Sequence, residues 1–327
     1  MEISRRHVGY TSNTPRAVEA FRLQKAGAIN VEVWTLGATL VAVEVPDKHG
    51  NMCNVCLRLP DLAAYENPAT NALIGSVIGR FARCIAFGKF VLCGQEYAVE
   101  CNIGEHHFHG GKIGFDRFVW DADIENNADT IRLRLRLTRP DGDQGYPGSI
   151  EAETTYEIDQ AGRLVIAHSA TVSAPTIVSL TCHAFWNLAG GGHINEHALQ
   201  VNADRLIACG PDFIPLPGPP VCVTRQGLDF RSARKLGENV LDNCFVLENS
   251  AWAVELSDLA SGRKLLMQTD QPGLAVYTGD HLPNRRNGVC LQSTALPDAP
   301  NRADFPSARI DPGQIYRHRT VYTFSSA

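Results

Sequence analysis

Short runs rich in valine, isoleucine, threonine and aromatic residues recur along almost the whole chain, separated by turn-forming residues. Such runs are typical of β-strands, whereas convincing amphipathic helices are almost absent. The clearest helical candidates are short, around Leu62–Tyr65 and Thr70–Gly79. The pattern predicts an all-β fold, an antiparallel sandwich or barrel. The runs are Ile29–Trp34, Leu40–Pro46, Lys89–Leu92, Thr130–Arg136, Ala152–Ile158, Arg163–Ala167, Thr176–Leu180, Ala253–Leu256, Leu274–Tyr277 and Thr320–Phe324.

The strand rhythm is not interrupted for long by any linker rich in proline, glycine and serine. The nearest candidate is Cys209–Pro220, but its apolar side chains indicate an ordered loop on the body of the protein. A chain of 327 residues is long enough for one large β domain or two ordinary ones. We expect a single domain over residues 1–327.

Charge and cysteine usage restrict the partners and the location. The formal net charge is −5, and the 30 lysines and arginines are spread along the chain. This distribution argues against a nucleic-acid or membrane partner and favours a small neutral molecule. The N-terminus lacks the apolar region of a signal peptide, and the ten cysteines are scattered. We therefore expect free thiols and a cytoplasmic protein.

Two stretches look at first like metal sites. Cys53 and Cys56 have the spacing of a zinc or redox pair, but no second pair follows them. The segment Glu105–Gly111 holds three histidines, yet the chain lacks a companion ligand set. We expect no metal, and interpret the histidine cluster as a place where one histidine forms hydrogen bonds or transfers protons.

The segment Ser179–Leu188 divides into two faces if it is a strand, because alternate residues point to opposite sides. One face is apolar and suits a core. The other carries polar and aromatic residues, including His183, and suits a ligand cavity. The same alternation argues against a nucleophilic pair made by Cys182 and His183. From the pattern alone, His183 fits a structural histidine and a functional one equally well.

Five motifs, in order along the chain, resemble those of the aldose 1-epimerase (galactose mutarotase) family. Together they are highly specific, and the resemblance runs from about Asn30 to the C-terminus. The motifs are Gly79–Ala82 with Ile85–Phe90, His107–Gly111 with Gly114–Asp116, Asp141–Gly148, Leu180–Gly190, and Leu296–Pro306 with Pro312–Gly313 and Tyr316–His318.

The resemblance implies a large antiparallel β-sandwich of the galactose mutarotase type with an open sugar cleft. It implies interconversion of the α and β anomers of a free sugar by ring opening and closure, without a cofactor. The residue matching the family's acid is His183, His109 matches the histidine that polarises the ring oxygen, and Asp242 matches the aspartate that holds sugar hydroxyls. We expect these residues and Gln292 to converge on one cleft.

The cleft is also expected to be lined by Phe185 and by Arg83 or Cys84, and three departures from the family pattern affect it. Gln292 stands where the family has its catalytic glutamate, and a neutral amide cannot take a proton. Cys84 stands in place of an arginine that contacts sugar, with Arg83 in place of the preceding asparagine. Ala275 stands where a glutamine is common. The loss of a long cation at Cys84 suggests a substrate other than the common hexoses.

These departures leave three hypotheses open. The chain is a mutarotase in which His109 or Asp242 replaces the missing base, a sugar-binding protein without catalysis, or an isomerase of another carbohydrate. Retention of His109, His183 and Asp242 favours an enzyme, because sugar binding alone does not require two histidines.

Overall fold

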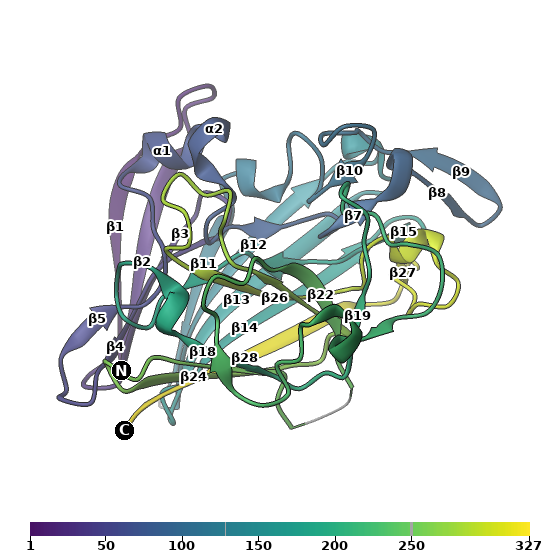
Figure 1. The fold of residues 1–327 in the computed structure, drawn as a ribbon. Coiled ribbons are helices and arrows are strands. Elements are labelled where there is room, and N and C mark those ends of the chain that lie inside the picture. Colours follow the sequence, from purple (N-terminus) through teal and green to yellow (C-terminus); the bar gives the residue numbers. More distant parts are fainter. Residues whose placement is uncertain (128, 249–250) are drawn as a thin grey trace.

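The longest strands form a nine-stranded antiparallel sheet in the computed structural model, which describes residues 1–127, 129–248 and 251–327 (Figure 1). Four strands that are consecutive in the sequence pair with one another, and the C-terminal strand connects them to the rest of the sheet. The order across the sheet is β11 (Asp121–Asn126), β12 (Thr130–Arg139), β13 (Ile150–Asp159), β14 (Leu164–Val172), β28 (Tyr316–Ser326), β24 (Arg263–Thr269), β23 (Val254–Ser257), β18 (Ala198–Val201) and β21 (Arg234–Lys235).

Apolar and polar side chains alternate along β12, which explains why this segment forms a strand with one buried and one solvent-facing side. Leu133 and Leu135 are fully buried, whereas Arg132, which precedes Leu133, lies on the outer face. There, Arg132 Nη2 lies 2.6 Å from Glu157 Oε2, on the residue directly opposite in β13. Opposite charges in register support the pairing, and the leucines supply the core.

A six-stranded antiparallel sheet lies in front of the nine-stranded sheet in Figure 1. Its strand β26 is buried along its whole length. Val289 and Leu291 on one face join the main core, while Cys290 and Gln292 on the other face line a cavity. The order is β17 (Phe185–Trp186), β26 (Val289–Thr294), β25 (Gly273–Tyr277), β22 (Asp242–Val246), β19 (Arg205–Ile207) and β20 (Val221–Cys222).

The N-terminal strands form a third, five-stranded sheet at the left of Figure 1. All three sheets contribute side chains to one continuous core, for example Val31, Tyr156 and Leu274. This is the layered packing expected of a sandwich. The strands of the third sheet, in order, are β1 (Glu2–Tyr10), β2 (Ala17–Lys25), β3 (Ile29–Trp34), β4 (Thr39–Pro46) and β5 (Met52–Asn54).

Four two-stranded pairs complete the strand pattern of the described residues, and two of them position histidines that line the cavity. His109 follows the pair β7–β10, and His183 follows β16. The pairs are β6 (Val77–Ile78) with β16 (Thr181–Cys182), β7 (Cys84–Ile85) with β10 (His107–Phe108), β8 (Lys89–Leu92) with β9 (Gln95–Ala98), and β15 (Thr176–Ile177) with β27 (Arg309–Ile310).

Only the first of the two expected helices is found as predicted. Helix α1 spans Leu62–Glu66, but α2 spans Pro68–Asn71, so the predicted helix over Thr70–Gly79 is wrong. The Asn67 side chain caps α2 and Pro68 fills its first position, which starts the helix earlier. Ala72 and Leu73 then adopt left-handed backbone angles, φ 46° and 58°, which end it. No helix in the described ranges is long and apolar enough to cross a membrane.

Candidate active site

Three neighbouring strands of the six-stranded sheet place a row of side chains across the cavity floor. Asp242 of β22 pairs with Tyr277 of β25, which pairs with Cys290 of β26. Two residues along the strands, Ala275 lies opposite Gln292. Residues two apart share a face, and all five line one cavity of about 970 Å³. The sheet register therefore brings Asp242 and Gln292, which are 50 positions apart in the sequence, to one surface.

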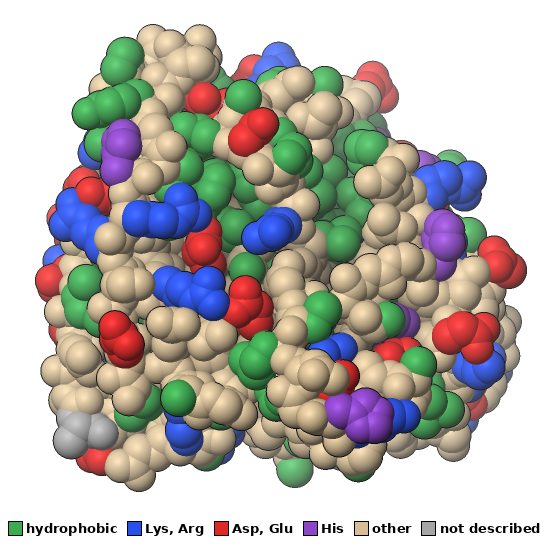
Figure 2. All heavy atoms as spheres, turned by 90° about the vertical axis from the view of Figure 1, so that its left-hand side faces the viewer, with side chains coloured by type: hydrophobic (Ala, Val, Ile, Leu, Met, Phe, Trp, Pro, Cys, Tyr) green, Lys and Arg blue, Asp and Glu red, His purple; other side chains and the backbone are tan. Residues whose placement is uncertain are grey.

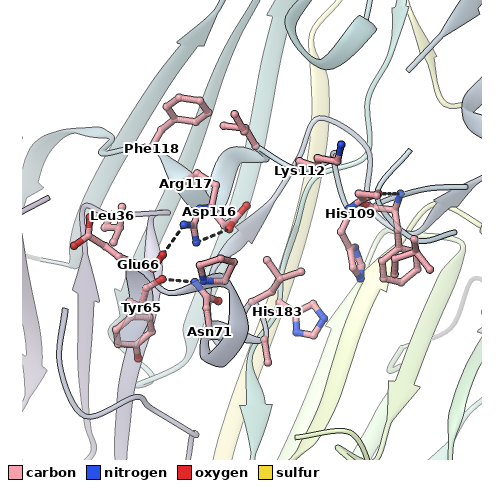
Figure 3. A pocket seen from close by; sticks show the side chains of 18 of the residues that line it. Leu36, Tyr65, Glu66, Asn71, His109, Lys112, Asp116, Arg117, Phe118 and His183 are labelled. Atoms are coloured by element: carbon pink, nitrogen blue, oxygen red, sulfur yellow. Dashed lines mark hydrogen bonds and ion pairs between the residues drawn. The ribbon is translucent and has the colours of Figure 1, made fainter. Parts of the chain in front are cut away.

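The two histidines expected in the site lie against each other at this cavity (Figure 3). Their ring centroids are 5.3 Å apart and the ring planes are nearly perpendicular. The backbone N–H of His183 donates to Ser76 and its C=O accepts from Gly75, which fixes the segment between β16 and β17. Both residues are less than one-tenth exposed. Histidines that the sequence separates by more than 70 positions thus form one unit.

A sharp turn aims His109 into the cavity. His109 has a left-handed backbone, φ 52°, and Gly110 follows with φ 89°. A Cβ atom at position 110 would lie 1.9 Å from the carbonyl oxygen of Gly79, so only glycine fits there. Steric exclusion of a side chain therefore explains why glycine follows His109.

The proton of His109 can be assigned from its hydrogen bond. The backbone N–H of Arg83 donates to His109 Nδ1 at 3.2 Å, so in the neutral ring the proton is on Nε2. Burial, together with the nearby His183 and Arg83, holds the pKa of His109 well below its ordinary value. His109 is therefore a neutral ring with one N–H to donate, and it is not available as the base.

His183 is also held neutral. Burial lowers its pKa to about 4, although a contact with its own backbone and the charge of Asp242 oppose the shift. Its Nδ1 lies 3.6 Å from the sulfur of Cys290. Burial raises the pKa of the Cys290 thiol well above its ordinary value, so the sulfur stays protonated.

Arg83 places a guanidinium in the cavity, although position 84, where the family has an arginine, is a cysteine. Its Nη1 donates to Asp242 Oδ1 at 3.1 Å. Burial disfavours the charged form of Arg83, yet attraction to Asp242 outweighs it and raises the pKa of the guanidinium. The Nε and Nη2 atoms of Arg83 are buried and have no partner among the described residues. The long cation that is missing at position 84 is therefore replaced in the cavity lining by the neighbouring Arg83, one of the two residues expected there.

Gln292 is 2% exposed and its Nε2 has no hydrogen-bond partner in the described part of the chain. Buried amides are normally paired, so an unpaired one at a cavity is a group available to a ligand. Opposite it, the small side chain of Ala275 leaves space at the cavity floor.

Two residues expected to line the cleft do not line it. Phe185 is fully buried, packed with Ile74 and Leu282, and its ring supports His183 at a centroid distance of 5.1 Å. Cys84 is 1% exposed, and its thiol donates to the carbonyl of Phe213 at 3.3 Å. In both cases another segment covers the side chain, so we no longer expect direct sugar contacts from them.

The other histidines of the 105–111 segment have structural partners. His107 Nδ1 lies 2.6 Å from the carbonyl oxygen of Glu100, and its Nε2 contacts the Tyr146 hydroxyl. The backbone N–H of Phe87 donates to His106 Nδ1 at 3.0 Å. No group of three or more His, Cys, Asp or Glu side chains that could hold a metal ion occurs among the residues the structure describes.

Sequence reasoning missed Tyr277 and Cys290, which complete the row with Asp242. Only the pairing register of β22, β25 and β26 identifies them. It also missed Asp116 and Asn71, two buried polar residues at the same cavity. Asp116 ends one of the motifs that resemble the family, but the motif alone gives it no role in the site.

Comparison with known proteins agrees with this fold. A family model described as aldose 1-epimerase matches residues 19–323. Galactose mutarotases of pig and human are each 33% identical over 333 residues, covering 95% of this chain and 95% of the relative. An aldose 1-epimerase of Escherichia coli K12 is 28% identical, covering 92% of this chain and 94% of the relative.

Solved structures resemble the chain over its full length. The galactose 1-epimerase of Lactobacillus acidophilus aligns with a TM-score of 0.89 at 24% identity, covering 100% of both chains. An aldose epimerase homologue from C. elegans aligns with a TM-score of 0.87 at 26% identity, covering 99% of this chain and 100% of the other. These alignments confirm the β-sandwich of the galactose mutarotase type.

Proposed function

Because the chain belongs to the aldose 1-epimerase family, we propose that it is a mutarotase, an isomerase that interconverts the α and β anomers of a free aldose. The bond between C1 and the ring oxygen breaks, the C1 hydroxyl becomes an aldehyde, and closure from the other face gives the other anomer. The observation that carries this function is the convergence of two neutral histidines with Asp242 and Gln292 in one cavity.

We assign the proton acceptor to Nε2 of His183. With a pKa of about 4 the ring is neutral, and we place its proton on Nδ1, 3.6 Å from the Cys290 sulfur, which can accept a weak hydrogen bond even as a thiol. Nε2 takes the proton from the C1 hydroxyl, and the imidazolium returns it to the ring oxygen as the C1–O bond breaks. One proton leaves O1 and one arrives at the ring oxygen, so the step is balanced without a carboxylate base.

His109 acts on the ring oxygen, at the C1–O bond that breaks. His109 carries its proton on Nε2, because Nδ1 accepts from the backbone of Arg83. We propose that this N–H donates to the ring oxygen and stabilises the charge that develops there. His109 acts throughout as a donor, which is why it cannot replace the missing glutamate.

The charged pair and the amide hold the sugar. Asp242, fixed by Arg83, accepts hydrogen bonds from hydroxyls, and its charge favours the imidazolium form of His183. Gln292 binds the C1 hydroxyl through its unpartnered amide. These roles require a small polyhydroxylated substrate and no cofactor.

We also propose that the chain acts as one domain in the cytoplasm. One continuous core containing residues from Phe21 to Tyr322 supports the single domain. All ten cysteines are free thiols, as is usual in a reducing compartment. Acidic and basic side chains are interspersed on the face that carries the N-terminal strands, which supports a neutral partner over nucleic acid (Figure 2).

Polarimetry on freshly dissolved α-anomers tests the function. With a panel of pentoses and hexoses, the wild-type protein should speed equilibration of at least one sugar above the buffer rate. Calorimetric titration with the same sugars separates the competing readings. A protein that binds a sugar of the panel but never changes its equilibration rate is a sugar-binding protein, and the mutarotase assignment is then wrong.

A further inference from the structure

The cavity is larger than one sugar ring requires. Its volume is about 970 Å³, near the top of the range for sites that take drug-sized ligands. A hexose has a dozen non-hydrogen atoms, and at the roughly 30 Å³ that one water takes in the liquid they would fill about 360 Å³ at most. The histidines, Asp242 and Gln292 therefore account for only part of the space.

The remaining part has its own lining, which we call the distal lobe. It is formed by Leu36, Tyr65, Asn71, Asp116, Arg117 and Phe118. In Figure 3 these residues lie on one side of His183, and His109 lies on the other. Two kinds of surface face the lobe, aromatic or aliphatic groups and a cluster of polar groups.

One buried polar group of the distal lobe lacks a partner, and a second is paired only at long range. Asn71 is 3% exposed, and its Oδ1 has no hydrogen-bond partner among the described residues. The Asp116 side chain is 6% exposed, and the nearest cation, Nη1 of Arg117, is 4.0 Å away. Burial raises the pKa of Asp116 to about 6. Leaving a buried acceptor such as Asn71 Oδ1 unpaired is unfavourable, and a hydroxyl group of a ligand would satisfy it.

The wall behind these groups is pre-formed. Asn71 Nδ2 donates to the carbonyl of Tyr65, and Arg117 Nη2 donates to the carbonyl of Glu66 at 2.5 Å. The Glu66 carboxylate accepts from the backbone N–H of Ser12 at 2.8 Å, which ties the loop between β1 and β2 to the end of α1. The family-model match begins only at residue 19, so this loop lies outside it.

We propose that the distal lobe is a second sugar subsite, so that the substrate is a reducing disaccharide or longer neutral saccharide with its reducing ring at the histidines. This inference rests on the proposed function. The lobe offers acceptors at Asn71 and Asp116, a donor at Arg117, and aromatic surface at Phe118. That combination fits a sugar ring, which has hydroxyl edges and apolar C–H faces. The charges of Asp116 and Arg117 balance, which favours a neutral ring.

Saturation-transfer NMR on glucose, maltose, cellobiose, lactose and melibiose tests the subsite, because each disaccharide has glucose as its reducing ring. At least one disaccharide should show a kcat/KM about tenfold or more above that of glucose. If glucose is turned over and no disaccharide exceeds it, the subsite is wrong while the mutarotase function stands. If no disaccharide is turned over while another aldose of the pentose and hexose panel is, the subsite is wrong and the mutarotase function stands. If no sugar of this set or of that panel is turned over, the mutarotase function fails, and the subsite with it.

Variants of Asp116 test whether the distal lobe causes the preference for a disaccharide over glucose. In Asp116→Leu the ratio of kcat/KM for the preferred disaccharide to that for glucose should fall about tenfold or more, because an acceptor is lost. Asp116→Asn keeps an acceptor and should retain most of the ratio, and Asp123→Leu on the exposed face of β11 is the surface control. Asn71→Ala replaces Asp116→Leu if the latter does not fold. An unchanged ratio, or an equal loss on both sugars, overturns the proposal.

Discussion

Replacing His183 by alanine should lower kcat/KM for anomerisation by about 10²–10⁴-fold, the range for a positioned acid–base group. The loss is expected to be large because Gln292 cannot take a proton and the N–H of His109 is a donor. In the proposed mechanism Asp242, which Arg83 holds, binds hydroxyls, so no other proton acceptor is assigned to the C1 hydroxyl. Polarimetry or saturation-transfer NMR on the same sugar, with wild type and variant at equal concentration, measures the change.

Two controls separate chemistry from folding. His193→Ala removes an exposed histidine remote from these roles and should keep wild-type activity. Added imidazole should restore part of the activity of His183→Ala, because the variant leaves a ring-sized space in an open cavity. A folded His183→Ala protein that keeps more than about one-tenth of wild-type activity contradicts the assigned role.

Restoring the carboxylate should increase activity. We expect Gln292→Glu to raise kcat about 10- to 100-fold, for two reasons. The new carboxylate is itself a base, and its negative charge stabilises protonated His183, which raises the pKa of that ring from about 4 toward the working pH. The substitution is nearly isosteric and breaks no hydrogen bond of Nε2 with the described residues.

The matched variant for this position is Gln292→Met, which keeps the length of the side chain and removes its polar atoms. It should lower kcat/KM, because the C1 hydroxyl loses a hydrogen-bond partner. If Gln292→Glu folds normally and is no faster than wild type, the glutamine is not a replacement for a lost base, and the position does not contact C1.

Much of the sheet structure could be predicted because alternation is a local signal. The leucines and arginines of β12 alternate without a break, and the structure forms the strand there. The hairpin β1–β2 was missed because most of β1 is exposed and polar, so it carries little apolar pattern. The helix expected over Thr70–Gly79 does not form, because Ala72 and Leu73 adopt left-handed backbone angles. Alanine and leucine side chains give no sequence signal for such angles.

The site was partly readable from the sequence. The face argument for Ser179–Leu188 separates His183 from the core correctly, since Leu180, Cys182, Ala184, Trp186 and Leu188 all belong to the main core. It failed for Phe185, because Ile74 and Leu282 cover that ring. Asp242 and His109 could be placed only through the family resemblance. The distal lobe depends on contacts between distant segments, for which the sequence carries no local signal.

The claim that neutral histidines replace the carboxylate base is tested most directly by NMR of the imidazole nitrogens. With ¹⁵N-labelled histidine, and His183→Ala to assign its signals, the protonation of His183 can be followed from pH 8 downward. A pKa lowered to about 4 means that the ring stays neutral through pH 5 and gains a proton only below that. We predict a neutral ring at pH 6 with the proton on Nδ1. A His183 that is already protonated at pH 7, or that carries its neutral proton on Nε2, would contradict the account.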